Sequence, residues 1–163
     1  MVAVGYRGDT FHGSQIQPNV RTVQGTIVNS IKKIGWWSDG CLGMSSRTDA
    51  GVSVRMNLAR LDLPDAVSGS VDERRVLRAL NDHLPDDIVA WGAMRVPEGS
   101  PSRPVISRKY YYRSEISRRW PVDVDMGHLQ EVCSIFEGHH DFSNFCRVEG
   151  GRETERTVGE CKP

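Results

Sequence analysis

The first third of the chain contains a short apolar run, then a segment rich in Gly, Asn and Pro, and then apolar residues at helical spacing. Residues 2–6 form a short β-branched and aromatic run that predicts a strand, and the Gly, Asn and Pro content of residues 8–19 predicts a long loop. A helix over 23–34 is then indicated by apolar residues at helical spacing, namely Val23, Ile27, Ile31 and Ile34. Thr22 is available as its N-cap and Gly35 as its stop.

The pattern over residues 54–63 is alternating, which predicts a strand, but its phase shifts by one residue. The apolar positions are first even and then odd: Val54, Met56, Leu58, then Ala59, Leu61, Leu63. A shift of one residue moves every following side chain to the other face, so a strand that keeps one buried face needs an extra residue at that point. We therefore expect a β-bulge near the middle of this strand.

A second amphipathic helix is predicted by apolar residues at positions 76, 77, 80 and 84, closed by Pro85. Ser70 and Glu73 have the spacing of a capping box at its start. Residues 88–96 follow as a strand. The order of elements over residues 1–96 is then β-α-β-β-α-β, which is the ferredoxin-like order.

The remaining residues, 97–163, predict the first part of a second, incomplete unit. Four residues, Pro97, Gly99, Pro101 and Pro104, indicate a linker or crossover. We expect a strand over 107–116, a helix near 125–137 ended by Gly138, and another strand starting at Thr157. The predicted class is α+β with a mostly antiparallel sheet.

Composition is typical of a globular protein: 163 residues, of which 38% are hydrophobic. Neither a signal-peptide core nor an apolar run long enough to span a bilayer is present, so we expect a cytoplasmic protein. The four cysteines lack zinc-binding spacing, which favours reduced structural thiols.

Charge is balanced at 21 basic and 21 acidic residues, but its distribution is uneven. Lys and Arg outnumber Asp and Glu by 7 to 3 in residues 1–61 and by 6 to 1 in residues 101–119, whereas acidic residues dominate the other segments. Two basic blocks brought together by folding would make a positive cleft suited to an anionic polymer. Scattered, solvated charges are the alternative.

The segment S-R-T-D-A-G-V over residues 46–52 is a candidate reaction centre. In an extended backbone, Arg47 and Asp49 share one direction while Thr48 turns aside. Ala50 and Gly51 leave room for a bulky substrate. An ordinary surface turn is the alternative.

This segment resembles the catalytic loop of the TruA family of tRNA pseudouridine synthases. Further family-like segments flank it in family order, at residues 5–15, 17–25, 107–112, 138–146 and 156–158. Several ordered matches are far more specific than one short motif. Departures occur at Ser14, Ser46 and Ser53, where bacterial relatives more often have an aromatic residue, a glycine and a histidine.

The resemblance implies roles for individual residues. Asp49 would be the nucleophile, attacking C1′ of the sugar or C6 of the base, and Arg47 would enter the base stack and help to expel the target uridine. Tyr110 would stack on the extruded uracil. RNA contacts would come from Gln15, Gln17, Arg21, Arg108 and Lys109.

The resemblance also implies a pseudouridine synthase fold with two ferredoxin-like halves and a catalytic cleft between them, the second half being incomplete here. Residues 1–96 would form the half with the Asp49 loop. In the family an arginine well downstream supports the aspartate, and no matching segment occurs before Pro163. Partners would be tRNA, modified in its anticodon stem-loop, and a second subunit of a homodimer; no metal or cofactor is needed.

Two other functions remain open from the sequence. A non-catalytic tRNA- or RNA-binding module would leave Asp49 unused. A metal-dependent phosphohydrolase is suggested by the consecutive residues His139, His140 and Asp141, but this chemistry normally needs a further aspartate, and none follows.

Overall fold

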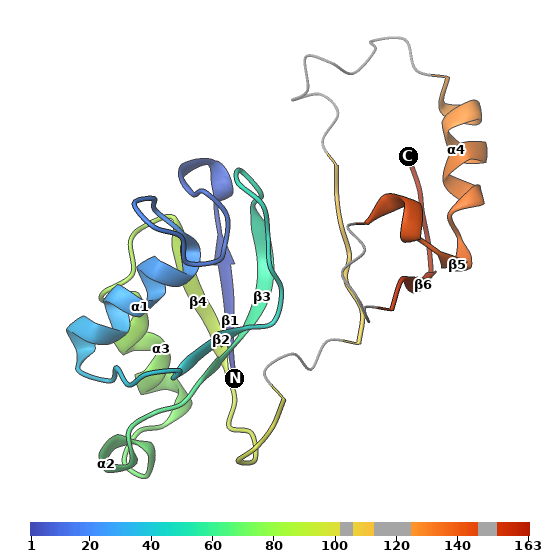
Figure 1. Ribbon diagram of the computed structural model, residues 1–163. Coiled ribbons are helices and arrows are strands. Elements are labelled where there is room, and N and C mark those ends of the chain that lie inside the picture. The colour runs from blue at the N-terminus through green and yellow to red at the C-terminus, as the bar shows by residue number, and fades with distance from the viewer. Residues whose placement is uncertain (102–105, 113–124, 147–152) are drawn as a thin grey trace. The chain divides into compact units, whose positions relative to one another are not determined.

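The computed structural model describes residues 1–101, 106–112, 125–146 and 153–163 (Figure 1). The chain divides into two compact units, Met1–Arg108 and Lys109–Pro163, and each is described by itself.

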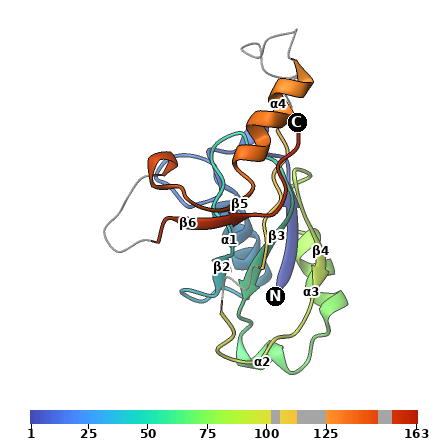
Figure 2. The same ribbon diagram turned by 90° about the vertical axis from the view of Figure 1, so that its right-hand side faces the viewer.

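The first unit is built on a four-stranded sheet. Its strands are β1 (Val2–Tyr6), β2 (Leu42–Met44), β3 (Val54–Leu61) and β4 (Ile88–Ala93), in the order β2-β3-β1-β4. Each neighbouring pair is antiparallel, with β1 in the centre between β3 and β4, as Figure 2 also shows. The expected order β-α-β-β-α-β is confirmed, and β2, whose range the sequence did not define, is the second strand.

Two helices, α1 (Val23–Ile34) and α3 (Glu73–Asn81), cover one face of this sheet (Figure 1). Helix α1 begins and ends as predicted. The Thr22 hydroxyl accepts a hydrogen bond from the Gly25 amide, and Gly35 adopts a left-handed conformation with φ of 83°. Two short helices, η1 (Gly8–Thr10) and α2 (Asp65–Ser68), were not predicted.

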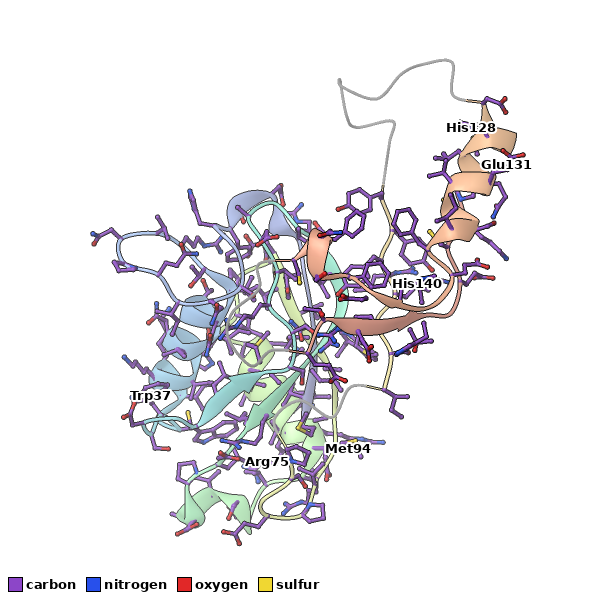
Figure 3. The ribbon with its side chains drawn as sticks, turned by 45° about the vertical axis from the view of Figure 1, so that its right-hand side comes forward. Trp37, Arg75, Met94, His128, Glu131 and His140 are labelled. Carbon is purple, nitrogen blue, oxygen red and sulfur yellow. The ribbon has the colours of Figure 1, made fainter. Side chains whose placement is uncertain are left out.

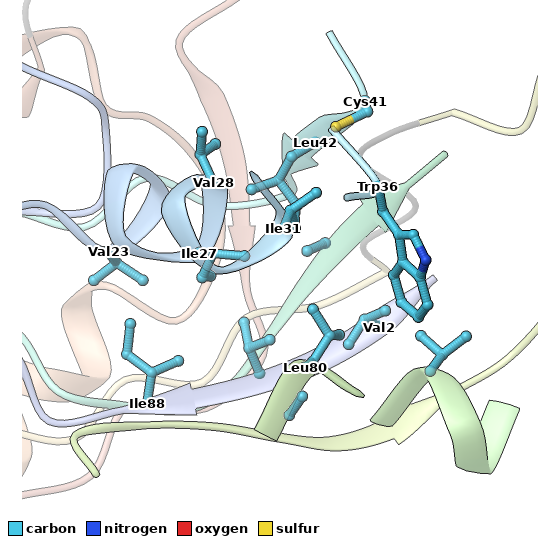
Figure 4. Packing of buried hydrophobic residues seen from close by; sticks show 14 of the residues in the cluster. Val2, Val23, Ile27, Val28, Ile31, Trp36, Cys41, Leu42, Leu80 and Ile88 are labelled. Carbon is cyan, nitrogen blue, oxygen red and sulfur yellow. The ribbon is translucent and has the colours of Figure 1, made fainter. Parts of the chain in front are cut away.

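The hydrophobic core lies between the sheet and these helices (Figure 4). Helix α1 contributes Ile31, which is fully buried, and the central strand β1 contributes Val2 and Val4. Leu80 of α3 packs in the same core. This packing explains why α1 and α3 are stable despite their modest length, since most helical stability in proteins comes from burying an apolar face.

Two predicted details of the first unit are wrong in position. The bulge lies earlier in β3: Val4 pairs with Asn57 but Tyr6 pairs with Val54, so the extra residue falls between 54 and 57. Met56 is consequently exposed. The N-cap of α3 is Asp72, whose carboxylate accepts from the Arg75 amide at 2.8 Å.

The second unit contains a helix and a two-stranded sheet. Helix α4 (Met126–Ile135) is capped by Asp125, close to its predicted start, and strands β5 (Gly138–Asp141) and β6 (Glu155–Val158) pair antiparallel. Strand β5 was not predicted. On α4, His128 and Glu131 lie 3.8 Å apart, one turn from each other (Figure 3).

Three phenylalanines cluster beside β5. Phe136 contacts Phe142 and Phe145 with ring centroids 6.4 Å and 5.7 Å away. Among the described residues Phe142 is half-buried, whereas Phe145 is 72% exposed.

The strand expected over 107–116 is not formed in its described part. Residues 107–112 have no strand structure, and residues 113–116 lie outside the described residues. A strand is held by backbone hydrogen bonds to a neighbour, and this segment has none in the described ranges.

All four cysteines are free thiols. No described helix is long and apolar enough to cross a membrane.

Candidate active site

The loop between β2 and β3 carries the candidate nucleophile. Arg47 and Asp49 are exposed, while Thr48 between them is half-buried and turned toward the protein. This alternation is the one expected for an extended backbone. The arrangement presents one cation and one carboxylate to solvent from a loop whose intervening residue is attached to the fold.

Thr48 is attached at its side chain and at both neighbouring peptide groups. Its hydroxyl is 3.0 Å from the Tyr6 hydroxyl. Its amide donates to the Ser14 hydroxyl at 2.8 Å, and its carbonyl accepts from the Ser14 amide at 3.0 Å. The central strand β1 and the segment before α1 therefore both hold the residue next to Asp49.

Ser46, on the upstream side of the loop, is held by Asn57 of β3. The Asn57 amide group donates to the Ser46 carbonyl at 2.9 Å, and its oxygen accepts from the Ser46 amide at 3.1 Å. The same amide group reaches the Tyr6 hydroxyl at 3.4 Å. Asn57 is only 3% exposed, so these polar groups replace the water that burial removes.

The downstream side of the loop is held by the segment that follows β1. The Gly51 amide donates to the Phe11 carbonyl at 3.3 Å, and the Gly8 amide donates to the Ser53 hydroxyl at 2.9 Å. A Cβ at Gly8 would overlap the Val52 carbonyl. Gly51 has φ of 80°, a conformation that side chains disfavour. The upstream side of the Asp49 loop is therefore attached to the sheet and its downstream side to the segment after β1.

The Asp49 side chain is exposed. Within the described residues its carboxylate has no hydrogen bond or ion pair, and Arg47 is not paired with it. An exposed carboxylate on an anchored loop is accessible to a large substrate. The sheltered pocket and the cationic partner that nucleophilic chemistry needs would have to come from elsewhere.

Arg21, one of the predicted RNA-binding residues, makes an ion pair that the sequence did not reveal. Its guanidinium contacts Asp87 at 2.6 Å and 2.9 Å and lies 4.2 Å from the centroid of Phe11. This guanidinium, with a hydrogen bond from Thr10, lowers the pKa of Asp87 to about 2, and the same ion-pair hydrogen bond raises the pKa of Arg21. Arg21 thus fixes the long loop to the start of β4.

The other predicted RNA-binding residues of the first unit are accessible. Gln15 and Gln17 are exposed, and the Gln17 amide donates to the His12 carbonyl at 2.7 Å. The Arg108 guanidinium donates to the Ser46 hydroxyl at 3.0 Å, which places a cation beside the Asp49 loop. Arg108 was predicted to contact RNA, not this loop.

Tyr110 and Lys109 belong to the second unit, so their distance from Asp49 is not defined. Tyr110 is 74% exposed, and the Lys109 ammonium lies 5.2 Å from the centroid of the Tyr111 ring. An exposed tyrosine next to cations can stack on a base, but the role of Tyr110 stays a prediction.

The consecutive residues His139, His140 and Asp141 do not converge. His139 contacts Thr157 at 3.1 Å, His140 contacts the Glu137 carbonyl at 2.7 Å, and Asp141 accepts from Ser143. Successive residues of a strand point to opposite faces, which separates the neighbouring histidines. In the described part of the chain, no three His, Cys, Asp or Glu side chains are grouped as metal ligands.

Sequence reasoning missed the residues that hold the loop, namely Tyr6, Ser14 and Asn57. Each is a buried polar residue. The alternation over residues 54–58 puts Asn57 opposite the apolar residues, on the face expected to be polar, so no local signal marked it as buried. Its partner could not be identified without the strand pairing.

Comparisons with known proteins agree with the sequence pattern. No family model matches the chain. It is 37% identical over 158 residues to the tRNA pseudouridine synthase A of Methanocorpusculum labreanum, covering 94% of this chain and 52% of that protein. The protein of the same name from Archaeoglobus fulgidus is 34% identical over 151 residues, covering 93% and 52%. The protein of the same name from Lactobacillus helveticus is 31% identical over 170 residues, covering 96% of this chain and 64% of that protein.

The chain spans about half the length of the curated relatives it matches. Within that half the similarity is nearly continuous, because each match covers more than nine tenths of this chain. The predicted resemblance is therefore confirmed: over nearly its whole length this chain is homologous to part of the proteins named tRNA pseudouridine synthase A.

Proposed function

We propose that this chain carries the nucleophile of a tRNA pseudouridine synthase that acts on uridines of the anticodon stem-loop. The observation that carries the proposal is the placement of Asp49. Its carboxylate is exposed and unpaired in the described residues, whereas the residues around it are attached to the fold by hydrogen bonds. Relatives over nearly the whole chain are named tRNA pseudouridine synthase A, which supports the same reaction here.

The reaction is an isomerisation and consumes no second reactant. Asp49 attacks the nucleotide at C1′ or at C6, and the bond from C1′ to N1 breaks. The uracil turns, a bond forms from C1′ to C5, the proton leaves C5, and N1 gains a proton as the carboxylate departs. A carboxylate nucleophile suffices for this chemistry, so the enzyme needs no metal or cofactor.

The target uridine must leave its stack before Asp49 can reach it. Arg47, exposed beside Asp49 on the same loop, would occupy the space that the base leaves. Tyr110 would stack on the extruded uracil. Covering by RNA and by protein would exclude water from Asp49, and cationic groups would keep it ionised.

The phosphate backbone would be bound by cations near the loop. Arg108 already lies against Ser46, and Lys109 follows it directly. Gln15 and Gln17 extend this surface as uncharged donors. The Arg21 side chain stays 40% exposed despite its pair with Asp87, so it could still face a phosphate.

The proposed architecture is the pseudouridine synthase fold, with a cleft between two ferredoxin-like halves. Residues 1–96 would be the half that carries the Asp49 loop, and 97–163 the first part of the other. The order of the four antiparallel strands in the first unit supports this assignment for the first half. A cytoplasmic homodimer that holds one tRNA across its subunits is the proposed assembly.

The test is site mapping on tRNA. Unmodified tRNA is incubated with the protein, treated with carbodiimide and reverse-transcribed. The parent should create stops in the anticodon arm and Asp49→Asn should create none. Asp39→Asn, which changes another exposed carboxylate outside the loop, should behave as the parent. Stops that persist with Asp49→Asn would overturn the role of this carboxylate.

A non-catalytic RNA-binding module is the second candidate, favoured by the absence of a cationic partner for Asp49 in the described ranges. It predicts tRNA binding without stops in either the parent or the variants. The same experiment therefore separates the two functions.

A further inference from the structure

We propose that Ser14 is a positioning residue for Asp49, acting through the peptide groups on both sides of Thr48. This inference rests on the proposed function, because it assigns a residue that sets the direction of the proposed nucleophile. Ser14 does not touch the substrate in this proposal.

One residue holds two consecutive peptide groups. The Ser14 hydroxyl accepts from the Thr48 amide at 2.8 Å, which fixes the peptide between residues 47 and 48. The Ser14 amide donates to the Thr48 carbonyl at 3.0 Å, which fixes the peptide between residues 48 and 49. Because the two peptides are planar, holding both sets the backbone angles of Thr48 and so the directions in which Arg47 and Asp49 leave the chain.

Ser14 is in turn anchored to helix α1. The Gln24 amide donates to the Ser14 carbonyl at 2.9 Å, and the Val23 amide donates to the Gly13 carbonyl at 3.2 Å. These are amides of the first helical turn, which have no partner inside the helix. Ser14 therefore links the start of a buried helix to the loop of the candidate nucleophile.

The close packing at this link leaves little room for another arrangement. Ser14 is 1% exposed. Gly13 has φ of 90°, and a Cβ there would lie 2.9 Å from the Thr48 carbonyl oxygen. Without the hydroxyl of Ser14, the Thr48 amide would lose its partner in a place that water cannot easily reach. The loop would then relax into other conformations.

The link also begins at the surface proposed to bind RNA. Gln15 directly follows Ser14 and is exposed, as is Gln17. RNA bound at these side chains would hold the Ser14 segment against Thr48. Binding at this loop and the placement of Asp49 are thereby coupled through one buried hydroxyl.

The test uses Ser14→Ala with Ser30→Ala as a matched control. Ser30 is also buried, at 3% exposure, and its hydroxyl donates to the His83 carbonyl at 2.9 Å. Ser30→Ala therefore also removes one buried hydroxyl, but from a residue of α1 that does not contact the Asp49 loop. Single-turnover pseudouridine formation and tRNA dissociation constants are measured for both variants and the parent. Exchange of the Thr48 amide is followed by NMR relative to that of Ile31.

We expect Ser14→Ala to lower the single-turnover rate at saturating protein about tenfold or more, with tRNA affinity changed less than about twofold. Thr48 exchange should rise at least about tenfold relative to Ile31, and Ser30→Ala should change neither quantity. An unchanged rate in Ser14→Ala, or equal effects in both variants, would overturn the proposal. A parent without activity would overturn the proposed function instead, while unchanged Thr48 exchange would by itself exclude Ser14 as the residue that holds the loop.

Discussion

The Arg21 guanidinium and the Asp87 carboxylate form a two-point ion pair, with Nη1 2.6 Å from Oδ2 and Nη2 2.9 Å from Oδ1. Asp87 is 9% exposed and accepts a third hydrogen bond from Thr10 at 2.6 Å. The pair joins the loop before α1 to the residue that immediately precedes β4. The two segments are 66 residues apart in the sequence. The ion pair therefore links distant parts of the first unit and stabilises its fold.

The pair predicts a pH-dependent contribution to stability. The pKa of Asp87 falls from 3.8 to about 2 on folding, so its charge favours the folded state above pH 3.8, and this contribution is lost as the pH falls toward 2. Asp87→Asn should lower the free energy of unfolding at pH 7 by about 2 kcal/mol, at about 1.4 kcal/mol per pKa unit. Urea unfolding at pH 7 and pH 3 should show about half of that difference remaining at pH 3.

Asp86→Asn is the control for this prediction, because Asp86 is the exposed neighbour of Asp87. Its effect should stay within about 0.5 kcal/mol at both pH values. A difference between parent and Asp87→Asn that grows as the pH falls would contradict the prediction.

Replacing Asn57 should lower both the stability of the protein and the rate of pseudouridine formation. Asn57→Ala removes the two hydrogen bonds to Ser46 and should cost about 2 kcal/mol of unfolding free energy, because it leaves partly buried backbone groups without a partner. We also expect slower pseudouridine formation, because the upstream side of the Asp49 loop is released. Thermal unfolding and single-turnover assays measure the two effects.

Asn81 offers a comparison with the same geometry. The Asn81 side-chain oxygen accepts from the Ala90 amide at 2.9 Å, and its side-chain nitrogen donates to the Ala90 carbonyl at 2.7 Å, away from the Asp49 loop. Asn81→Ala should therefore destabilise without slowing the chemical step at a temperature where the protein is folded. Equal slowing in both variants would show that general destabilisation, not the loop, lowers the activity.

Gly8 should not tolerate a side chain. A Cβ at this position would overlap the Val52 carbonyl, just downstream of Asp49, so Gly8→Ala must push the loop away from η1. Overpacking of this kind costs about 1–3 kcal/mol. Chemical denaturation of Gly8→Ala and of Gly69→Ala measures the contrast.

Gly69 lies at the end of α2 with φ of −81°, and a Cβ at this position would have no neighbouring atom within 4 Å. Gly69→Ala should be neutral or more stable by about 0.4–1 kcal/mol, because alanine restricts the unfolded chain. A Gly8→Ala protein as stable as Gly69→Ala would mean that the loop can move without cost.

Arg108 predicts a change in the salt dependence of tRNA binding. If its guanidinium contacts one phosphate, Arg108→Ala should reduce the slope of log affinity against log salt concentration by about one. Arg75→Ala changes an exposed arginine of α3 (Figure 3) and should leave the slope unchanged. Filter binding at several salt concentrations gives both slopes, and equal slopes for Arg108→Ala and the parent would place Arg108 away from the RNA backbone.

Much of the first unit was readable from local sequence. Helix α1 was predicted with its cap at Thr22 and its stop at Gly35, and both are confirmed. The Asp49 motif and the family resemblance were also available, and the homology is confirmed. Spacing and capping act between residues close in the chain, so the sequence displays them directly.

What the sequence by itself determined is therefore the order of elements, the apolar faces of the helices and the motif that carries Asp49. Only the tertiary structure decided that Ser14 and Asn57 hold the Asp49 loop, that Arg21 is paired with Asp87, and where the bulge lies in β3. The physical reason is that a hydrogen bond or ion pair depends on two groups meeting. Which groups meet across tens of residues is set by strand pairing and helix packing, not by the neighbours of either group along the chain.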